Sequence, residues 1–147
     1  MELARQNMPV SGIFYGVDAT MTVLKRKDFV RWQTGEKLPD AGLCQAVEEM
    51  ENGLIDADLG GFLYKKRVAR PGGGKSGGYR TVLSARIGDR YVFLHGFAKN
   101  DKASITQNEK KALQFAGKVF LALSLGDLAK ALQAGVLVEV HCVQQAH

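Results

Sequence analysis

Hydrophobic and polar residues recur with two different periods along the chain, and these periods predict its helices and strands. The run at residues 21–25 is β-prone and predicts a short strand. Residues 27–34 contain enough apolar side chains for a short helix that ends at Gly35. After Pro39, which is tolerated in a first helical turn, apolar residues recur at steps of four, three and four, which predicts a second helix. These apolar residues form one stripe along the helix and are Leu43, Val47, Met50 and Leu54.

The middle of the chain predicts three strands. They cover residues 62–68, 79–87 and 90–97, and a loop too rich in glycine for regular structure, 71–78, separates the first two. The dipeptide Gly88-Asp89 predicts a two-residue type II′ hairpin, so the last two strands pair antiparallel. Because both faces of these strands carry apolar residues, we expect helices over one face and a partly buried groove along the other.

Two capping boxes predict the helices that follow. Thr106 precedes Glu109 by three residues, and Ser124 precedes Asp127 in the same way. A last β-prone run at 136–140 is suited to closing an edge of the sheet. The order of elements indicates an α+β domain: a small, mainly antiparallel sheet with the N-terminal helices packed on one face, followed by C-terminal helices.

Length and composition favour one globular domain. The chain has 147 residues, 46 % of them hydrophobic and 24 % charged, and no apolar run approaches the roughly 18 residues of a membrane span. Residues 1–20 show neither periodicity nor a secretory signal and are expected to be an extension that the fold does not need. We expect the domain at 21–140 and a short tail at 141–147.

The two cysteines, Cys44 and Cys142, lie far apart and form no CxxC pair. This arrangement argues against a disulfide framework and against a zinc site, and it fits a reducing cytoplasm. No spacing of histidines suggests a metal site, and no serine or cysteine is marked as a nucleophile. His95 alternates with Phe93 and Phe97 and is expected to be a packed strand residue rather than a base.

Charge is strongly polarised along the sequence. The segment from Lys65 to Lys102 contains ten basic and two acidic residues. The segment from Glu36 to Asp58 contains seven acidic residues and one lysine. This pattern predicts a basic face and an acidic face, and the basic face suits a polyanion or an acidic partner. The alternative is a solvated surface with an uneven charge count.

Strand alternation sorts the basic residues onto faces. Lys65 and Arg67 share one face and Lys66 takes the other. If Arg80 and Lys99 join Lys65 and Arg67, the four form a cationic groove with no carboxylate to neutralise it. The alternative is that these side chains extend outward from an edge of the sheet.

The glycine-rich loop contains Lys75 and Ser76 but is not a nucleotide-binding P-loop. The position five residues before its Gly-Lys step is Ala69 rather than glycine, and a strand follows where a P-loop needs a helix. We expect a flexible loop from which Lys75 reaches a phosphate. Tyr79 is a candidate stacking platform for a base, although aromatic residues at strand starts are more often part of a core.

The segment LGGFLYKKRVARPGGGKSGGYR at residues 59–80, followed by FAKN at 97–100, resembles the RelE/HigB branch of the RelE/ParE toxin superfamily, over about residues 21–140. The resemblance implies a RelE-like fold and a toxin of a type II toxin–antitoxin system. Relatives are cytoplasmic proteins that cut mRNA in the ribosomal A site without a metal or other cofactor. Others in the superfamily poison DNA gyrase instead.

The resemblance also suggests which residues act. The two strand lysines of the family match Lys65 and, with a conservative change, Arg67; its arginine after the loop matches Arg80, and its last basic position falls near Lys99. We expect these four to be catalytic, with Arg80 stabilising the transition state and Lys65 acting as a base or proton shuttle. The tyrosine of some members is missing, since Ile105 and Thr106 occupy that neighbourhood. Further residues expected to bind RNA are Lys66, Arg70, Lys75, Tyr79, Arg86 and Lys102.

The implied partners are the ribosome, mRNA and a cognate antitoxin, expected to be a helix-turn-helix protein. An acidic segment of the antitoxin is expected to cover the groove and contact Lys65 or Arg80. The alternative functions are a non-catalytic binding toxin of the gyrase-inhibiting kind and a degenerate basic module that binds nucleic acid or the antitoxin.

Overall fold

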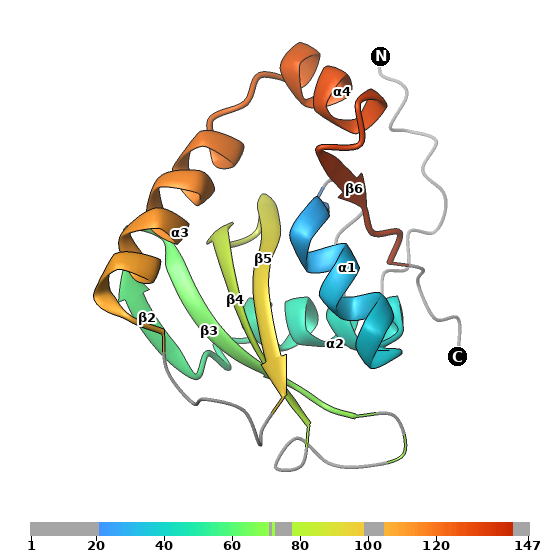
Figure 1. The fold of residues 1–147 in the computed structure, drawn as a ribbon, viewed down its shortest axis with the longest axis vertical. Coiled ribbons are helices and arrows are strands. Elements are labelled where there is room, and N and C mark those ends of the chain that lie inside the picture. The colour runs from blue at the N-terminus through green and yellow to red at the C-terminus, as the bar shows by residue number, and fades with distance from the viewer. Residues whose placement is uncertain (1–20, 71, 73–77, 99–104, 143–147) are drawn as a thin grey trace.

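The computed structural model describes residues 21–70, 72, 78–98 and 105–142. Within these residues, helices and strands follow the expected α+β order, and the predicted fold class is confirmed (Figure 1). The elements in chain order are β1 Thr22–Arg26, α1 Lys27–Glu36, α2 Asp40–Glu51, β2 Ala57–Gly60, β3 Leu63–Val68, β4 Tyr79–Arg86, β5 Arg90–Ala98, α3 Gln107–Leu121, α4 Leu125–Gln133 and β6 Leu137–Glu139.

One six-stranded sheet in the order β2-β3-β4-β5-β1-β6 organises the described part of the chain. β1 runs parallel to β5, and all other neighbouring strands are antiparallel. β6 pairs with β1 and forms one edge of the sheet, as the sequence predicts. The other edge is β2, which the sequence analysis missed because its four residues end at a pair of glycines where the pattern indicated only a break.

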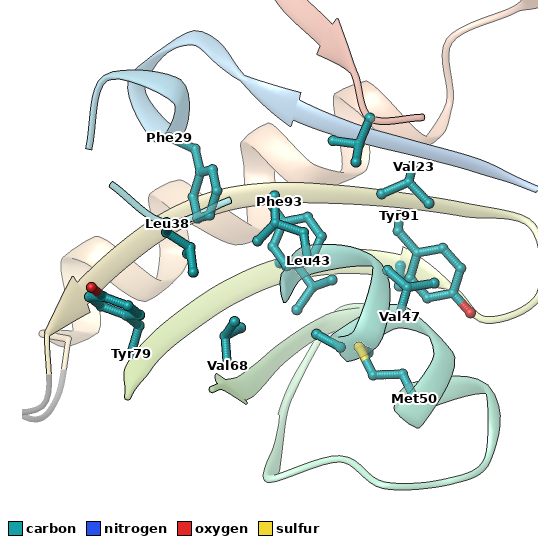
Figure 2. Close-up of a cluster of buried hydrophobic side chains, with 14 residues drawn as sticks. Val23, Phe29, Leu38, Leu43, Val47, Met50, Val68, Tyr79, Tyr91 and Phe93 are labelled. Atoms are coloured by element: carbon teal, nitrogen blue, oxygen red, sulfur yellow. The ribbon is translucent and has the colours of Figure 1, made fainter. Parts of the chain in front are cut away.

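Helices α1 and α2 cover one face of the sheet, as predicted (Figure 1). Figure 2 shows the core between them, in which side chains of α2 pack against those of β3, β4 and β5. Three of the four predicted stripe residues, Leu43, Val47 and Met50, are buried there. Leu54 is not part of the helix and is 55 % exposed, because α2 ends at Glu51 and Gly53 turns the backbone at φ +86°.

Helix α3 packs on the opposite face, where the sequence analysis expected a groove. Leu113 and Leu121 join a second core with Val82 and Leu94, so this face is open only beyond the helix. The helix lies close to β4 at Gly117: a Cβ atom added there would stand 1.7 Å from the hydroxyl of Ser84. A glycine at this position therefore lets α3 approach the sheet.

Helices α3 and α4 begin at the two predicted N-cap residues, but of the two only α3 has the complete capping box. The Thr106 hydroxyl accepts a hydrogen bond from the Glu109 amide at 3.0 Å, and the Glu109 carboxylate accepts one from the Thr106 amide at 2.7 Å. Ser124 caps α4 by accepting from the Asp127 amide.

The hairpin between β4 and β5 is longer than predicted. Arg86 pairs with Arg90, which leaves three residues in the turn rather than two.

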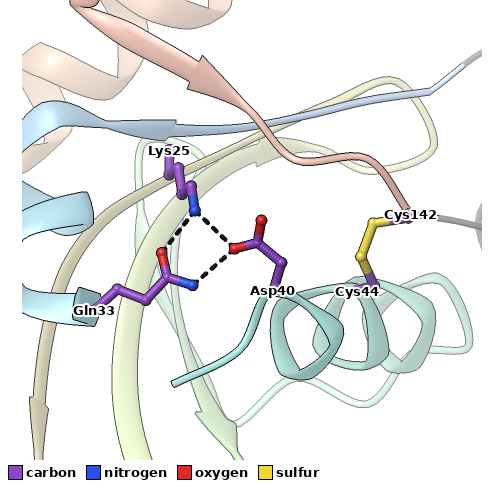
Figure 3. Close-up of a disulfide and its surroundings, with 5 residues drawn as sticks. All are labelled: Lys25, Gln33, Asp40, Cys44 and Cys142. Atoms are coloured by element: carbon purple, nitrogen blue, oxygen red, sulfur yellow. Dashed lines mark hydrogen bonds and ion pairs between the residues drawn. A yellow bond between two sulfur atoms is a disulfide. The ribbon is translucent and has the colours of Figure 1, made fainter. Parts of the chain in front are cut away.

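The cysteine prediction is wrong. Cys44 on α2 and Cys142, just beyond β6, form a disulfide across 98 residues of sequence (Figure 3). Their spacing does not indicate this contact, because it depends on the tertiary structure: β6 pairs with β1, and the segment that follows β6 reaches α2. Lys25 lies nearby and donates to Gln33 at 2.8 Å and to Asp40 at 2.7 Å, so a polar cluster joins β1, α1 and α2 beside the disulfide.

Among the described residues, no single helix is long and apolar enough to cross a membrane. Only α3 and α4 taken together reach that length and composition, and they meet at a bend of 113°.

Candidate nucleic-acid interface

Lys65, Arg67 and Arg80 lie on one face of the β3–β4 pair, as strand alternation predicts. Arg67 stands directly opposite Arg80, and Lys65 stands opposite Val82, whose side chain belongs to the core under α3. The three cations are therefore on the same face as α3, towards the end of the sheet where β4 begins. We call Lys65, Arg67 and Arg80 the cationic face.

Arg80 has a buried nitrogen atom without a partner. Its Nη1 is inaccessible to solvent and makes no hydrogen bond in the described structure. A guanidinium nitrogen in this state loses its hydration without compensation, which costs free energy. An anionic group would supply the missing hydrogen bond once the Arg80 side chain turned to expose this nitrogen.

Arg67 differs from Arg80 because a carboxylate holds it. Asp56, in the segment before β2, accepts from the Arg67 backbone amide at 2.6 Å and from its Nε at 3.1 Å. Partial burial raises the pKa of Asp56, but the hydrogen bonds from Arg67 and the charges of Lys66 and Arg67 together outweigh this effect and leave that pKa below its usual value. The expectation of a groove without any carboxylate is thus wrong, since Asp56 fixes Arg67 in place.

Lys66 points to the other face, as predicted, but there it is buried rather than available to a ligand. Its side chain is 2 % exposed, and its ammonium donates to Glu49 of α2 at 2.8 Å. This ion pair links β3 to α2 under the helix layer. The position contradicts the expected contact with RNA, so we leave Lys66 out of the interface.

Tyr79 is a core residue, the alternative that the sequence analysis left open. It is 3 % exposed, its ring meets Trp32 edge-on at 5.5 Å, and its hydroxyl donates to the Glu36 carbonyl. The guanidinium of Arg70 lies over the Tyr79 ring at 5.1 Å. The ring is therefore covered on the described structure and offers no platform for a base.

Arg86 lies at the far end of β4 from Arg80. Its Nε pairs with Asp89 and its Nη1 donates to the Leu121 carbonyl at the end of α3. Arg90 donates to the Phe120 and Leu123 carbonyls, so both arginines bind the last turn of that helix, where its dipole favours cations. Arg86 is not brought to the cationic face. Lys75, Lys99 and Lys102 lie outside the described residues.

Two residues that the sequence analysis set aside, His95 and Phe97, adjoin the cationic face. Val82 pairs with His95 and Arg80 with Phe97, and the two rings are 5.8 Å apart. His95 lines a hollow of about 190 Å³ together with Arg26 and Glu109. Burial lowers the pKa of His95, which keeps the imidazole neutral at pH 7.

The expected alternation of His95 holds for Phe97 but fails for Phe93, because a register shift between Val82 and Leu83 places Phe93 in the core under α1 and α2. The alternation also did not reveal that β5 ends beside an open hollow, because that depends on where α3 begins. No group of three or more metal-ligating side chains occurs among the described residues. The arrangement instead offers cations and a neutral imidazole around an open strand face, a set of groups suited to a phosphate backbone.

The chain matches the model of a known protein family. The family model described as the RelE toxin of the RelE/RelB toxin–antitoxin system matches residues 21–140. The match covers every helix and strand described above. A search of curated proteins returned no match.

Proposed function

We propose, on the premise that the chain belongs to the RelE family of toxins, that it is a ribosome-dependent endoribonuclease which cuts mRNA and thereby stops translation. Membership of the family makes the chain the toxin of a toxin–antitoxin pair with a cognate antitoxin as its partner. The proposal adds the reaction, the substrate and the residues that carry them.

The observation that carries the proposal is the unpaired, buried Nη1 of Arg80 beside Arg67 and Lys65. Two cross-strand arginines repel each other, and the described structure supplies a carboxylate to only one of them. A phosphate group satisfies both the charge and the fork-shaped donor geometry of Arg80. RNA presents that group at every nucleotide.

The proposed reaction is a transesterification within the RNA strand. The 2′-oxygen attacks the adjacent phosphorus while its proton leaves, the bond from phosphorus to the 5′-oxygen breaks, and that oxygen takes a proton. The products carry a 2′,3′-cyclic phosphate and a 5′-hydroxyl. Arg80 stabilises the negative charge that develops on the phosphate oxygens, and Arg67, oriented by Asp56, binds the same or the next phosphate. Lys65 is the proposed base or proton shuttle, and the ribosome positions the message.

A binding toxin that inhibits DNA gyrase is the second candidate, because the same cationic face would hold a nucleic-acid backbone without cutting it. In either case we place the protein in the cytoplasm, where ribosomes and gyrase are found, although the Cys44–Cys142 disulfide removes the cysteine argument for that compartment. We expect a helix-turn-helix antitoxin that lays an acidic segment over Lys65 and Arg80.

The test mixes the purified chain with ribosomes translating a defined message and maps the cut sites by primer extension. We expect cuts within the codon in the A site, and no cuts in free mRNA. A parallel assay measures supercoiling by gyrase. Inhibition of gyrase without any cleavage of ribosome-bound mRNA would overturn the proposal in favour of the second candidate.

A matched pair of variants ties the result to the site. Lys65→Ala/Arg80→Ala removes two cations from the cationic face, and Arg31→Ala/Lys130→Ala removes two exposed cations from α1 and α4. Both variants lower the net charge by the same amount. Cleavage should be lost in the first and kept in the second.

A further inference from the structure

The outer side of α3 exposes large apolar side chains that the fold does not use. Phe115 is 73 % exposed and Val119, one helical turn later, is 45 % exposed. They point away from Leu113, Gly117 and Leu121, the residues that α3 packs against the sheet. Ala122 is also exposed and continues the same side of the helix. An exposed phenylalanine beside an exposed valine lowers the solubility of the protein, and a partner that covers both side chains would remove this effect.

The turn between β2 and β3 adds a third large apolar side chain next to this side of α3. Phe62 is 54 % exposed and has φ +65°, in the left-handed region that a bulky residue rarely adopts. Gly60 and Gly61 before it also have positive φ, and the Phe62 carbonyl is held by the Ala85 amide at 3.0 Å. The backbone therefore presents the ring outward at an energetic cost that glycine in its place would avoid.

A hollow connects the turn with the helix. It measures about 170 Å³ and is lined by Phe62, Lys118, Leu121, Ala122 and Arg86. Lys118 lies beside the turn: a Cβ added to Gly61 would be 3.4 Å from its Cε. The hollow is thus an apolar cup with cations at its rim, of a size to receive one large apolar side chain.

The charge around these residues is positive. Helix α3 carries three lysines and one glutamate, and Lys111 and Lys118 stand on the same side as Phe115. Within the described structure, neither lysine forms an ion pair. A second copy of the chain would bring like charges together here, whereas a segment with alternating apolar and acidic residues would match both the ring and the lysines. We call Phe62, Lys111, Phe115, Lys118, Val119 and Ala122 the α3 surface.

We infer that the α3 surface is a docking site for an acidic, amphipathic segment of the antitoxin, separate from the cationic face. An apolar side chain of that segment fills the cup beside Phe62, others cover Phe115 and Val119, and its carboxylates pair with Lys111 and Lys118. The inference rests on the existence of an antitoxin partner and not on the proposed reaction, since no residue of the α3 surface belongs to the cationic face.

The experiment measures the affinity of the purified antitoxin for the full chain by titration calorimetry. Phe115→Ser/Val119→Ser should weaken binding by at least about tenfold, because aromatic residues at the centre of an interface contribute most of its affinity. Val138→Ser, which removes an exposed apolar side chain from β6 at the distant edge of the sheet, is the control and should bind normally. Lys111→Glu/Lys118→Glu should also weaken binding and should reduce its dependence on salt.

Phe62→Gly separates docking from folding. It removes the ring and relieves the positive φ, so the melting temperature should not fall while the affinity for the antitoxin does. Toxic activity without antitoxin should be unchanged in all these variants, whether that activity is RNA cleavage or gyrase inhibition. If the chain does not cleave RNA, the measurement of antitoxin affinity therefore still tests this inference.

Three results would overturn the inference. The first is normal antitoxin binding by the Phe115→Ser/Val119→Ser and Lys111→Glu/Lys118→Glu variants. The second is a dimer of the chain alone, seen by sedimentation, that Phe115→Ser/Val119→Ser dissociates, because the occupant is then a second copy. The third is binding to phosphatidylglycerol vesicles that the same variant abolishes, because the occupant is then a membrane.

Discussion

Arg67 and Arg80 stand directly opposite each other on neighbouring antiparallel strands, and only Arg67 has a carboxylate partner among the described residues. Directly opposed like charges destabilise a sheet. The fold thus holds one arginine in a fixed geometry and leaves the other with an unsatisfied nitrogen. This asymmetry predicts that the two residues contribute unequally to any reaction at a phosphate.

Arg80→Ala should lower the rate of cleavage of ribosome-bound mRNA by about 100-fold or more, since the loss of one well-placed electrostatic donor costs about 3 kcal/mol at the transition state. Arg80→Lys should recover only part of the rate, because an ammonium cannot form two parallel hydrogen bonds. Ribosome binding should weaken far less than the rate. The measurement is single-turnover cleavage with ribosomes in excess, alongside the Arg31→Ala control. Cleavage by Arg80→Ala at the parental rate would show that Arg80 is not catalytic.

Lys66→Met should destabilise the fold by about 3 kcal/mol, because it leaves the Glu49 carboxylate without the ammonium that now pairs with it in a largely buried position. The double variant Lys66→Met/Glu49→Leu should regain most of that stability, since an apolar pair of similar volume replaces the ion pair. Urea denaturation measures both. Cleavage should be unaffected at temperatures where the variants are folded; a selective loss of cleavage in Lys66→Met would return this lysine to the RNA-binding set.

Asp40 should make the stability of the protein depend on pH in the acid range. Partial burial raises the pKa of its carboxyl. Hydrogen bonds from Gln33 and Lys25, with the charges of Lys25 and His141, lower this pKa by a larger amount. The pKa of Asp40 in the folded protein therefore lies below 3.8. The carboxylate therefore stabilises the fold above that pH, and this contribution is lost as the pH falls through the folded pKa.

Asp40→Asn tests this dependence. Its melting temperature should be below that of the parent at pH 7, and the difference should shrink as the pH falls below 3.8. Asp28→Asn is the control, because Asp28 is exposed and, among the described residues, pairs with Arg31 alone, on the same helix. A difference for Asp40→Asn that stays constant down to pH 2.5 would show that its charge does not matter.

Reduction of the Cys44–Cys142 disulfide should lower the stability of the fold. A crosslink that closes a ring of about 100 residues lowers the conformational entropy of the unfolded chain, which adds up to about 4.7 kcal/mol to the free energy of unfolding. Thermal unfolding with and without a phosphine reductant measures the effect, and Cys44→Ser/Cys142→Ser should match the reduced parent. Cleavage should not change, because the disulfide joins α2 to the C-terminal segment, on the opposite side of the sheet from the cationic face. Equal melting temperatures in both conditions would count against a contribution from the crosslink.

Local patterns in the sequence predicted most of the elements of this fold. The N-caps at Thr106 and Ser124, the apolar stripe of α2 and the pairing of β4 with β5 depend on residues within a few positions of each other. Alternation along β3 likewise put Lys65 and Arg67 on one face and Lys66 on the other.

The predictions that failed depend on contacts between distant segments. The acidic window before residue 58 was interpreted as a separate face, but two of its members, Glu49 and Asp56, pair with Lys66 and Arg67 because α2 and the segment before β2 lie along β3. The same limit applies to Cys44 and Cys142, and to the hollow at His95, whose boundary is the start of α3. Spacing along the chain carries no information on these distances.

The position of β1 governs when the domain can be completed during synthesis. β1 is made before the other described strands, yet its neighbours are β5 and β6, which begin at Arg90 and Leu137. The edge of β1 that faces β5 can pair once residues 90–98 have left the exit tunnel, whereas the edge that faces β6 stays unpaired until residues 137–139 have done so. The antiparallel unit β2–β3–β4 needs no later strand and can form earlier. The β1 side of the sheet is therefore closed last, and an antitoxin already present in the cell can meet a chain in which β2–β3–β4 has formed while β1 still lacks β6.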